Sequence, residues 1–256
     1  MEIRASSPSA TSRASQTSES ELKDGDKGVI VQRDRVSYAI APHTPCGLVT
    51  PELLRRIADV AERYGCTAIK LTSAERIAMI GLASQDIDTV WRELGMLPGG
   101  VTGDVVRSVK VCPGTQHCKR GQQDSIAVGL VLDARYHGKS MPGKMKIGVS
   151  GCPNQCSETW FKDIGIVGTK PGWDLLVGGS GGAVAQIGSR IAKGVSTERI
   201  LELVAGTIAF YRAEARPKER LYRTLARVGI ERLTGYLGLK PLAEGTLGQQ
   251  KAPGAP

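Results

Sequence analysis

Between residues 28 and 65, short apolar runs alternate with polar segments in the way expected of strands followed by a helix. Residues 28–31 and 36–40 are rich in β-branched and apolar side chains, which is typical of strands. Thr50 is suited to cap a helix whose first residue is Pro51, and apolar side chains then recur at helical spacing until Gly65. This stretch therefore predicts two strands and one amphipathic helix.

The next stretch repeats the same alternation. Residues 67–82 are predicted to form a strand, because apolar and β-branched residues dominate them. Ser84 is expected to open a short helix over residues 85–94, which Gly95 ends. Together with the preceding elements, this pattern predicts an α+β domain over residues 27–103.

Apolar periodicity continues over residues 104–240 and predicts a second, mixed α+β domain. Its expected strands cover residues 105–111, 144–149, 164–167 and 173–177, and its expected helices cover residues 122–135 and 197–211. Two of the strands lead directly into pairs of cysteines. The fold class predicted from the pattern is therefore α+β in two units.

The two ends of the chain lack a periodic apolar face. Residues 1–26 are rich in Ser, Thr, Ala and charge, and residues 241–256 contain several prolines and glycines. Both are predicted to be disordered tails. No run approaches the roughly 18 apolar residues of a transmembrane helix, so we expect no membrane and a cytoplasmic location.

Composition adds an anionic partner to this picture. Aromatic residues make up 4% of the 256 residues and glycines number 32, so the core should be aliphatic and many turns tight. The formal net charge is +9, which favours a negatively charged ligand. The basic residues are dispersed and few aromatics accompany them, so we expect a buried anion rather than nucleic acid.

Four of the six cysteines form two close pairs, C-x5-C and C-x3-C, at Cys112, Cys118, Cys152 and Cys156. Four thiolates favour zinc or an iron–sulfur cluster. Structural zinc sites usually use C-x2-C or C-x4-C pairs on small knuckles, whereas here the partners are five and three residues apart, which places zinc second. The other two, Cys46 and Cys66, are expected to be buried free cysteines.

The residues around these pairs carry a resemblance to a known family. The segments concerned are Val-Cys-Pro-Gly at 111–114, Ser-Gly-Cys-Pro-Asn-Gln-Cys at 150–156, and the glycine-rich run from Asp163 to Gly179. Over residues 28–215 the chain resembles the sulfite and nitrite reductases. This resemblance implies a ferredoxin-like α/β sandwich followed by a sirohaem and 4Fe-4S binding domain. It also implies that the four cysteines hold the cluster and that Cys156 bridges it to the sirohaem iron.

The resemblance further implies site residues. Lys144 and Lys146 resemble the family's two lysines that reach the bound anion, and Arg107 stands where the family often supplies another anion-binding arginine. Asn154 resembles the family's asparagine in the second cysteine loop.

The glycine run after residue 177 lacks the complete dinucleotide motif. We therefore interpret Gly178, Gly179 and Gly181 as a nest of backbone N–H groups for the macrocycle carboxylates. One departure from the family pattern is Ala74, which stands where larger relatives carry an arginine. Arg76, two residues on, would point to the same side of a strand. Either Arg76 replaces the missing arginine, or the pocket suits another substrate or none.

The expected activity is the multi-electron reduction of a small oxyanion, sulfite or nitrite. No nicotinamide or flavin motif is present, so electrons should come from a partner such as ferredoxin or a flavoprotein. Full-size members of the family contain the arrangement twice, so a homodimer is possible here. The alternatives are a non-catalytic electron carrier, a haem-binding sensor or, third, a zinc-stabilised module.

Overall fold

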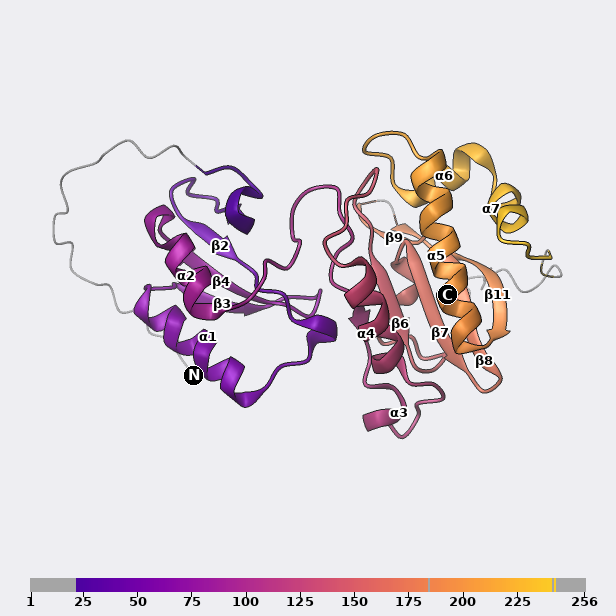
Figure 1. Cartoon of the computed structure of the whole chain (residues 1–256), viewed down its shortest axis with the longest axis horizontal. Coiled ribbons are helices and arrows are strands. Elements are labelled where there is room, and N and C mark those ends of the chain that lie inside the picture. The colour runs from indigo at the N-terminus through magenta and orange to yellow at the C-terminus, as the bar shows by residue number, and fades with distance from the viewer. Residues whose placement is uncertain (1–21, 184, 241, 243–256) are drawn as a thin grey trace, which may run out of the picture.

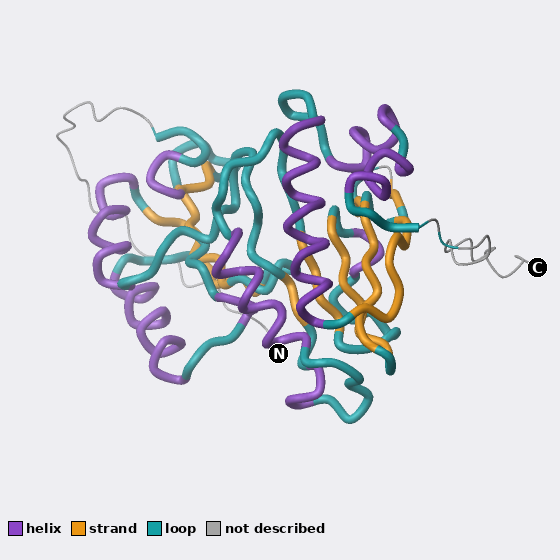
Figure 2. Tube along the Cα trace, turned by 45° about the vertical axis from the view of Figure 1, so that its right-hand side comes forward, coloured by secondary structure: helices purple, strands orange, loops and turns teal. Residues whose placement is uncertain are grey.

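The structure, a computed structural model, describes residues 22–183, 185–240 and 242. It consists of two α+β units, which are seen side by side in Figure 1. Loop segments run between the two sheets, together with helical segments (Figure 2). The predicted tails lie outside the described residues except for 22–26 and 242. Within the described ranges, no helix is both long enough and apolar enough to cross a bilayer.

The first unit is a four-stranded antiparallel sheet packed against two helices. The chain path β2–α1–β3–β4–α2 is the β-α-β-β-α part of a ferredoxin-like motif, and β1 pairs beside β2 to give the order β1-β2-β4-β3. The elements are β1 (Val29–Val31), β2 (Tyr38–Ile40), α1 (Pro51–Arg63), β3 (Ala68–Leu71), β4 (Ile77–Leu82) and α2 (Ile87–Leu94). Side chains from α1, α2 and the sheet form one apolar core.

Helix α1 begins and ends where the sequence predicts. The Thr50 hydroxyl accepts the Leu53 N–H at 3.2 Å, and Pro51 occupies the first position. Gly65 follows with a φ of 63°. Helix α2 ends at Gly95, also at positive φ, and the short 3₁₀ turn Ser84–Asp86 precedes it. These boundaries confirm the capping signals.

The single strand predicted over residues 67–82 is wrong. The segment is a hairpin in which β3 pairs antiparallel with β4, with Leu71 opposite Ile77. The turn between them contains Glu75 in the left-handed region at a φ of 58°, and its N–H donates to the Thr72 carbonyl. The polar residues 72–76 break the apolar run, which is the turn signal that the prediction overlooked. All four residues of the edge strand β3 are exposed.

The second unit is a five-stranded mixed sheet in the order β11-β8-β7-β6-β5. Strands β5, β6 and β7 run parallel to one another, whereas β8 pairs antiparallel with both β7 and β11. The strands are β5 (Lys110–Val111), β6 (Ile147–Ser150), β7 (Ile164–Thr169), β8 (Gly172–Val177) and β11 (Ser189–Val195), and a small hairpin joins β9 (Ser180–Gly181) to β10 (Ala185–Gln186). The helices are α3 (Gly114–His117), α4 (Ser125–Tyr136), α5 (Thr197–Glu214), α6 (Leu221–Val228) and α7 (Ile230–Tyr236). Helices α4 and α5 cover the sheet and share its core (Figure 1).

The predictions for this unit succeed where apolar runs are long. Strands β7 and β8 and helices α4 and α5 lie where the sequence placed them. The strand predicted over 105–111 is mostly wrong, because only Lys110–Val111 pairs, while Val105 and Val106 form isolated bridges. The strand predicted over 144–149 begins at Ile147. Strand β11 and helices α6 and α7 were not predicted, since their apolar residues are interrupted by glycines and charges.

Candidate functional site

Two neighbouring parallel strands bring the cysteine pairs to one edge of the second sheet. Cys112 directly follows β5 and Cys152 follows β6, and these strands pair with Val111 opposite Val149. The Cys112 N–H donates to the Val149 carbonyl at 3.2 Å, and the Gly151 N–H donates to Cys112 Sγ at 3.1 Å. The loops that carry the pairs are therefore in direct contact.

The four cysteine side chains differ in exposure. Cys112 and Cys152 are buried, Cys118 is half-buried at the end of α3, and Cys156 is exposed. Over the part of the chain that the structure describes, no three His, Cys, Asp or Glu side chains are grouped as a metal site. The four thiols thus share one edge of the sheet without converging on a single point.

Three glycines allow the cysteine loops to interlock. A Cβ on Gly121 would lie 2.6 Å from the backbone of Gly114, and one on Gly151 would lie 2.7 Å from the Gln123 carbonyl oxygen. A Cβ on Gly168 would lie 2.6 Å from the Gly151 carbonyl oxygen. Any side chain at these positions would separate the loops, so their spacing depends on glycine. No motif in the sequence predicts this role for these three positions.

The remaining cysteines are not part of this edge. Cys46 is buried and Cys66 is half-buried, and both are free. Burial raises the pKa of the Cys46 thiol to about 12, so this group stays protonated and is a poor nucleophile. The expectation of a buried free cysteine is confirmed for Cys46.

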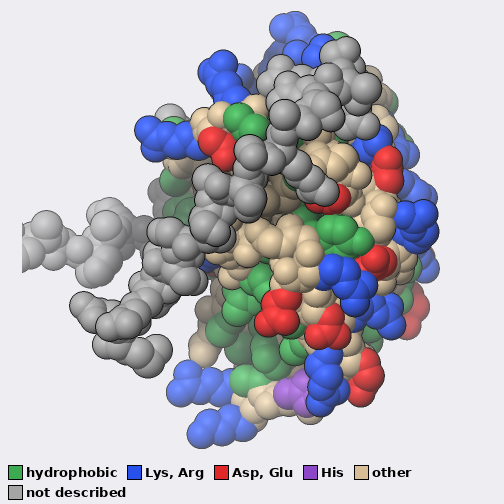
Figure 3. Space-filling view, turned by 90° about the vertical axis from the view of Figure 1, so that its left-hand side faces the viewer, with side chains coloured by type: hydrophobic (Ala, Val, Ile, Leu, Met, Phe, Trp, Pro, Cys, Tyr) green, Lys and Arg blue, Asp and Glu red, His purple; other side chains and the backbone are tan. Residues whose placement is uncertain are grey.

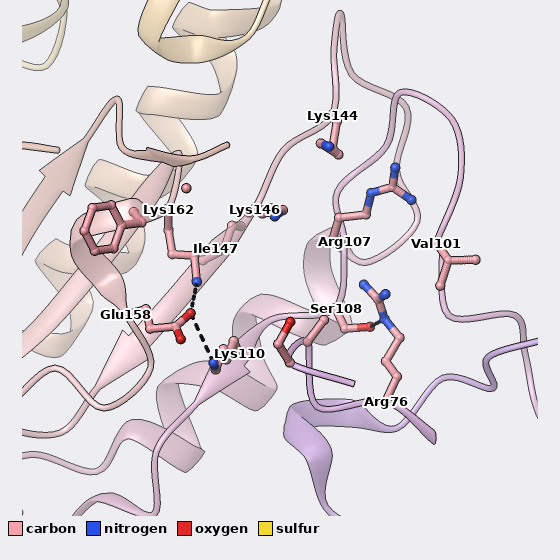
Figure 4. A pocket seen from close by; sticks show the side chains of 14 residues that line it. Arg76, Val101, Arg107, Ser108, Lys110, Lys144, Lys146, Ile147, Glu158 and Lys162 are labelled. Atoms are coloured by element: carbon pink, nitrogen blue, oxygen red, sulfur yellow. Dashed lines mark hydrogen bonds and ion pairs between the residues drawn. The ribbon is translucent and has the colours of Figure 1, made fainter. Parts of the chain in front are cut away.

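A pocket of about 390 Å³ lies between the two units and is lined by an excess of basic side chains. Figure 4 shows these side chains around it. The basic residues are Arg76, Arg107, Lys110, Lys144, Lys146 and Lys162, and the acidic one is Glu158. We call this the basic pocket. Elsewhere on the molecule, on the face drawn in Figure 3, Lys and Arg are dispersed among Asp and Glu.

Lys144 and Lys146 both line the basic pocket, whereas Met145 between them is fully buried in the core. This alternation arises because the segment runs extended, with Met145 bridged to Val106. Burial lowers the pKa of Lys146, and the nearby charges of Lys144 and Lys162 lower it further. Lys146 is therefore a better proton donor than a solvated lysine.

Both predicted arginines reach the pocket. The Arg107 guanidinium donates to the carbonyls of Gly100, Thr102 and Gly103, so it is fixed by the loop between the units. Arg76 is 8% exposed and donates from Nε to Ser108 Oγ at 2.9 Å. Burial, together with the Arg107 charge, lowers the pKa of Arg76 to about 10.

The geometry expected for Arg76 needs correction. It does not lie in a continuous strand with Ala74, because residues 72–76 form the β3–β4 turn. Both residues nevertheless line the basic pocket. The turn, and not strand alternation, therefore brings Arg76 to the same pocket as Ala74.

Three further charged residues of the pocket were not predicted. Glu158 lies 3.3 Å from Lys110 Nζ and 3.1 Å from Lys162 Nζ, forming the ion pairs drawn in Figure 4. Lys110 lies two residues before Cys112, and Glu158 lies two residues after Cys156. This proximity to the cysteines is the only sequence signal that marks them.

The predicted glycine nest is divided by the fold. Gly178 and Gly179 are buried directly after strand β8. A Cβ on Gly179 would lie 2.2 Å from the Trp160 carbonyl oxygen, so the backbone there is closely packed. Gly181 is exposed and lines the basic pocket. Asn154 is exposed in the loop between Cys152 and Cys156, next to Gln155 at a φ of 51°.

The residues present suit an iron–sulfur cluster beside an anionic macrocycle. Thiols and a backbone N–H directed at sulfur are the groups that hold and tune such a cluster. Six basic side chains against one acidic side chain would receive several carboxylates. The chemistry of the donors thus agrees with both groups.

Comparison with known proteins agrees with this arrangement. Residues 102–240 match the family described as nitrite and sulphite reductase 4Fe-4S domain, and residues 30–97 match the nitrite/sulfite reductase ferredoxin-like half domain. The chain is 39% identical over 210 residues to an assimilatory-type sulfite reductase of Nitratidesulfovibrio vulgaris, covering 82% of this chain and 96% of that protein. It is 37% identical over 207 residues to a nitrite reductase [NAD(P)H] of Bacillus subtilis, covering 81% of this chain and 26% of that protein.

Solved structures show the same fold. Dissimilatory sulfite reductase I superimposes with a TM-score of 0.74 at 18% identity, covering 81% of this chain and 70% of that one. The NirA protein of Mycobacterium tuberculosis gives a TM-score of 0.69 at 20% identity, covering 78% of this chain and 39% of that one. The α+β fold with a ferredoxin-like first unit is thereby confirmed. On its two domains, its fold and its sequence, the chain belongs to the nitrite and sulfite reductase family of oxidoreductases.

Proposed function

We propose that this protein reduces sulfite or nitrite, using a 4Fe-4S cluster held by Cys112, Cys118, Cys152 and Cys156 and a sirohaem in the basic pocket. The observation that carries the proposal is the position of that pocket. It is lined by residues that flank Cys112 and Cys156 in the sequence, so a macrocycle there would adjoin the cysteine loops. When bound, the two groups supply electrons to the oxyanion and a metal coordination site for it.

The protein's own residues would bind and orient the anion. Lys144 and Lys146 line the pocket from one extended segment, and Arg107 lines it from the neighbouring segment, whose Arg107 N–H donates to the Met145 carbonyl. Arg76 reaches the pocket from the first unit (Figure 4). Charge-assisted hydrogen bonds from these groups would hold a small oxyanion, and Lys146 could also give up a proton. The electron donor would be a separate protein such as ferredoxin or a flavoprotein.

Anaerobic purification and spectroscopy test the cofactor assignment. The wild type is expected to show sirohaem bands and to contain iron, acid-labile sulfide and sirohaem. Cys156→Ser is expected to lose the coupling between cluster and sirohaem, whereas Cys66→Ser, outside the cysteine edge, serves as the matched control. Wild-type iron and sirohaem contents with intact magnetic coupling in Cys156→Ser would overturn the assignment.

Activity measurements separate the reductase from the electron carrier or sensor. With reduced methyl viologen as donor, the wild type is expected to consume sulfite or nitrite. A protein with both cofactors that binds neither anion and shows no turnover would instead support the carrier or sensor. A colourless protein containing zinc would support the structural module. The possible homodimer stays a prediction, which light scattering of the holoprotein can test.

A further inference from the structure

Three side chains form a connected line from the basic pocket into the interface between the units. Ser108 lines the pocket, and its Oγ accepts the Arg76 Nε–H. The same hydroxyl lies 3.5 Å from His43 Nδ1. The other ring nitrogen, His43 Nε2, lies 2.7 Å from Asp133 Oδ2. Serine, imidazole and carboxylate thus follow one another in the order of a Ser–His–Asp relay.

The carboxylate end of this line is buried and ionised. The Asp133 side chain is 4% exposed and the His43 side chain is 12% exposed. Burial raises the pKa of Asp133, but hydrogen bonds from His43 and from the Val109 N–H outweigh it and lower the pKa. A fixed carboxylate of this kind orients the imidazole ring. The 3.5 Å separation to Ser108 is typical of a relay that tightens only with its substrate bound.

A second imidazole stacks on the first. The rings of His43 and His137 are 3.4 Å apart and nearly parallel, at 7°. Burial, and then the neighbouring His43, lower the pKa of His137. His137 Nε2 is buried without a hydrogen-bond partner among the described residues. Of the two rings, only His43 has a hydrogen bond to the Asp133 carboxylate.

We propose that Ser108, His43 and Asp133 deliver protons to the anion in the basic pocket, an inference that rests on the proposed reductase function. Each oxygen that leaves the anion as water takes up two protons and two electrons. The electrons come from the donor protein through the cofactors, and the protons come from solvent. The Ser108 O–H gives its proton to the leaving oxygen and takes the His43 Nδ1 proton in return.

His43 Nδ1 then regains a proton from solvent, while the Nε2–H stays on the ring and remains hydrogen-bonded to the Asp133 carboxylate. Ser108 is the group that meets the anion, and His43 and Asp133 are positioning residues that act through it. Arginines cannot serve in this role because the guanidinium does not release its proton. Lys144 and Lys146 remain as parallel donors, so removing the relay is expected to slow turnover without abolishing it.

The same contacts could instead only hold the two units together, since His43 belongs to the first unit and Asp133 to the second. The two roles differ in what they change. A structural contact affects cofactor content and unfolding, whereas a proton relay affects turnover, its solvent isotope effect and its rescue by an added proton donor. Loss of His43 or Asp133, neither of which lines the pocket, should leave the anion affinity unchanged.

The experiment uses anaerobically purified holoprotein with sulfite or nitrite and reduced methyl viologen. His43→Gln and Ser108→Ala are expected to lower kcat by about 10²-fold, the lower end of the usual effect of general acid–base catalysis. The solvent deuterium isotope effect on kcat should rise in both variants. In His43→Gln, whose side chain does not line the pocket, the sulfite affinity from spectral titration should stay at the wild-type value. In His43→Ala, added imidazole should restore part of kcat. His137→Phe, which keeps the stacked ring, is the control and should behave as wild type.

Several outcomes would overturn the relay. Unchanged kcat and isotope effect in both His43→Gln and Ser108→Ala would do so, as would a loss of kcat accompanied by no isotope effect and no imidazole rescue. If His43→Gln fails to retain its cofactors, Ser108→Ala decides alone, because it removes a single hydroxyl. Failure of the reductase proposal is a different result, in which the wild type itself neither binds nor reduces either anion.

Discussion

Replacing Arg76 with methionine should make the protein more stable and its anion binding weaker. Arg76 is 8% exposed, and five other basic side chains line the same pocket. Its pKa falls from 12.5 to about 10 on folding, chiefly because of burial and next because of Arg107. At 1.36 kcal/mol per pKa unit, the folded state bears a cost of about 3 kcal/mol for this charge.

The Arg76 charge also destabilises the folded state at neutral pH. Arg76 is protonated in both the folded and the unfolded chain at pH 7, so the whole cost is present there and declines only as the pH rises above about 10. Loss of the hydrogen bond to Ser108 removes about 1 kcal/mol of stability. The difference between the cost of the buried charge and the value of the hydrogen bond predicts that Arg76→Met raises the free energy of unfolding by about 2 kcal/mol. Methionine can fill the same apolar space.

Anion binding should change in the opposite direction. A charge-assisted hydrogen bond contributes about 1.5–3 kcal/mol, so Arg76→Met should raise the sulfite dissociation constant by roughly tenfold to a hundredfold. Urea unfolding of the full chain without cofactors measures the first effect, and spectral titration of the holoprotein measures the second. Arg55→Met is the matched control, because the Arg55 side chain is 73% exposed and outside the pocket. A less stable Arg76→Met protein with wild-type sulfite affinity would refute the reasoning.

Three other predictions concern charges described above or adjoining them. Lys146→Met should lower kcat more than Lys144→Met, because burial lowers the pKa of Lys146; equal losses in steady-state assays would contradict this. Asp163 is fully buried and accepts three hydrogen bonds from Arg220, so Asp163→Ala should destabilise the fold by about 3–5 kcal/mol in urea unfolding, and a loss below about 1 kcal/mol would argue against it. Hydrogen bonds from Arg227 and the Arg216 N–H lower the pKa of Glu219 to about 2 from 4.5; its stabilising effect should be complete above pH 4.5 and lost as the pH falls toward 2, so thermal scans of Glu219→Gln and wild type should converge there and not at neutral pH.

Local signals in the sequence explain which elements could be predicted. The caps of α1 and α2 depend on Thr50, Pro51 and Gly95, whose effects act over a few residues and are therefore visible in the sequence. The β3–β4 turn was missed because Glu75 adopts a positive φ that its residue type does not announce. Strand β5 is short because its neighbours bridge to other segments, which depends on tertiary contacts.

The candidate site shows the same limit. Lys144 and Lys146 could be expected together because they are two residues apart in an extended run, and the structure places both in the pocket. The hydrogen bond between His43 and Asp133 joins residues 90 positions apart, so no local pattern in the sequence indicates it. Pairings at that separation depend on how the two units pack, and a single sequence does not disclose them.

The basic pocket has walls from both units, with Ala74 and Arg76 on one side and Lys144 and Lys146 on the other. Any anion bound there is consequently a non-covalent crosslink between two separately folded cores, and it also relieves repulsion between their facing cations. Binding that favours only the joined arrangement adds stability in proportion to the logarithm of ligand concentration. Anion binding should therefore couple the thermal unfolding of the two cores into one cooperative transition. The ligand would then stabilise the contact between the two units.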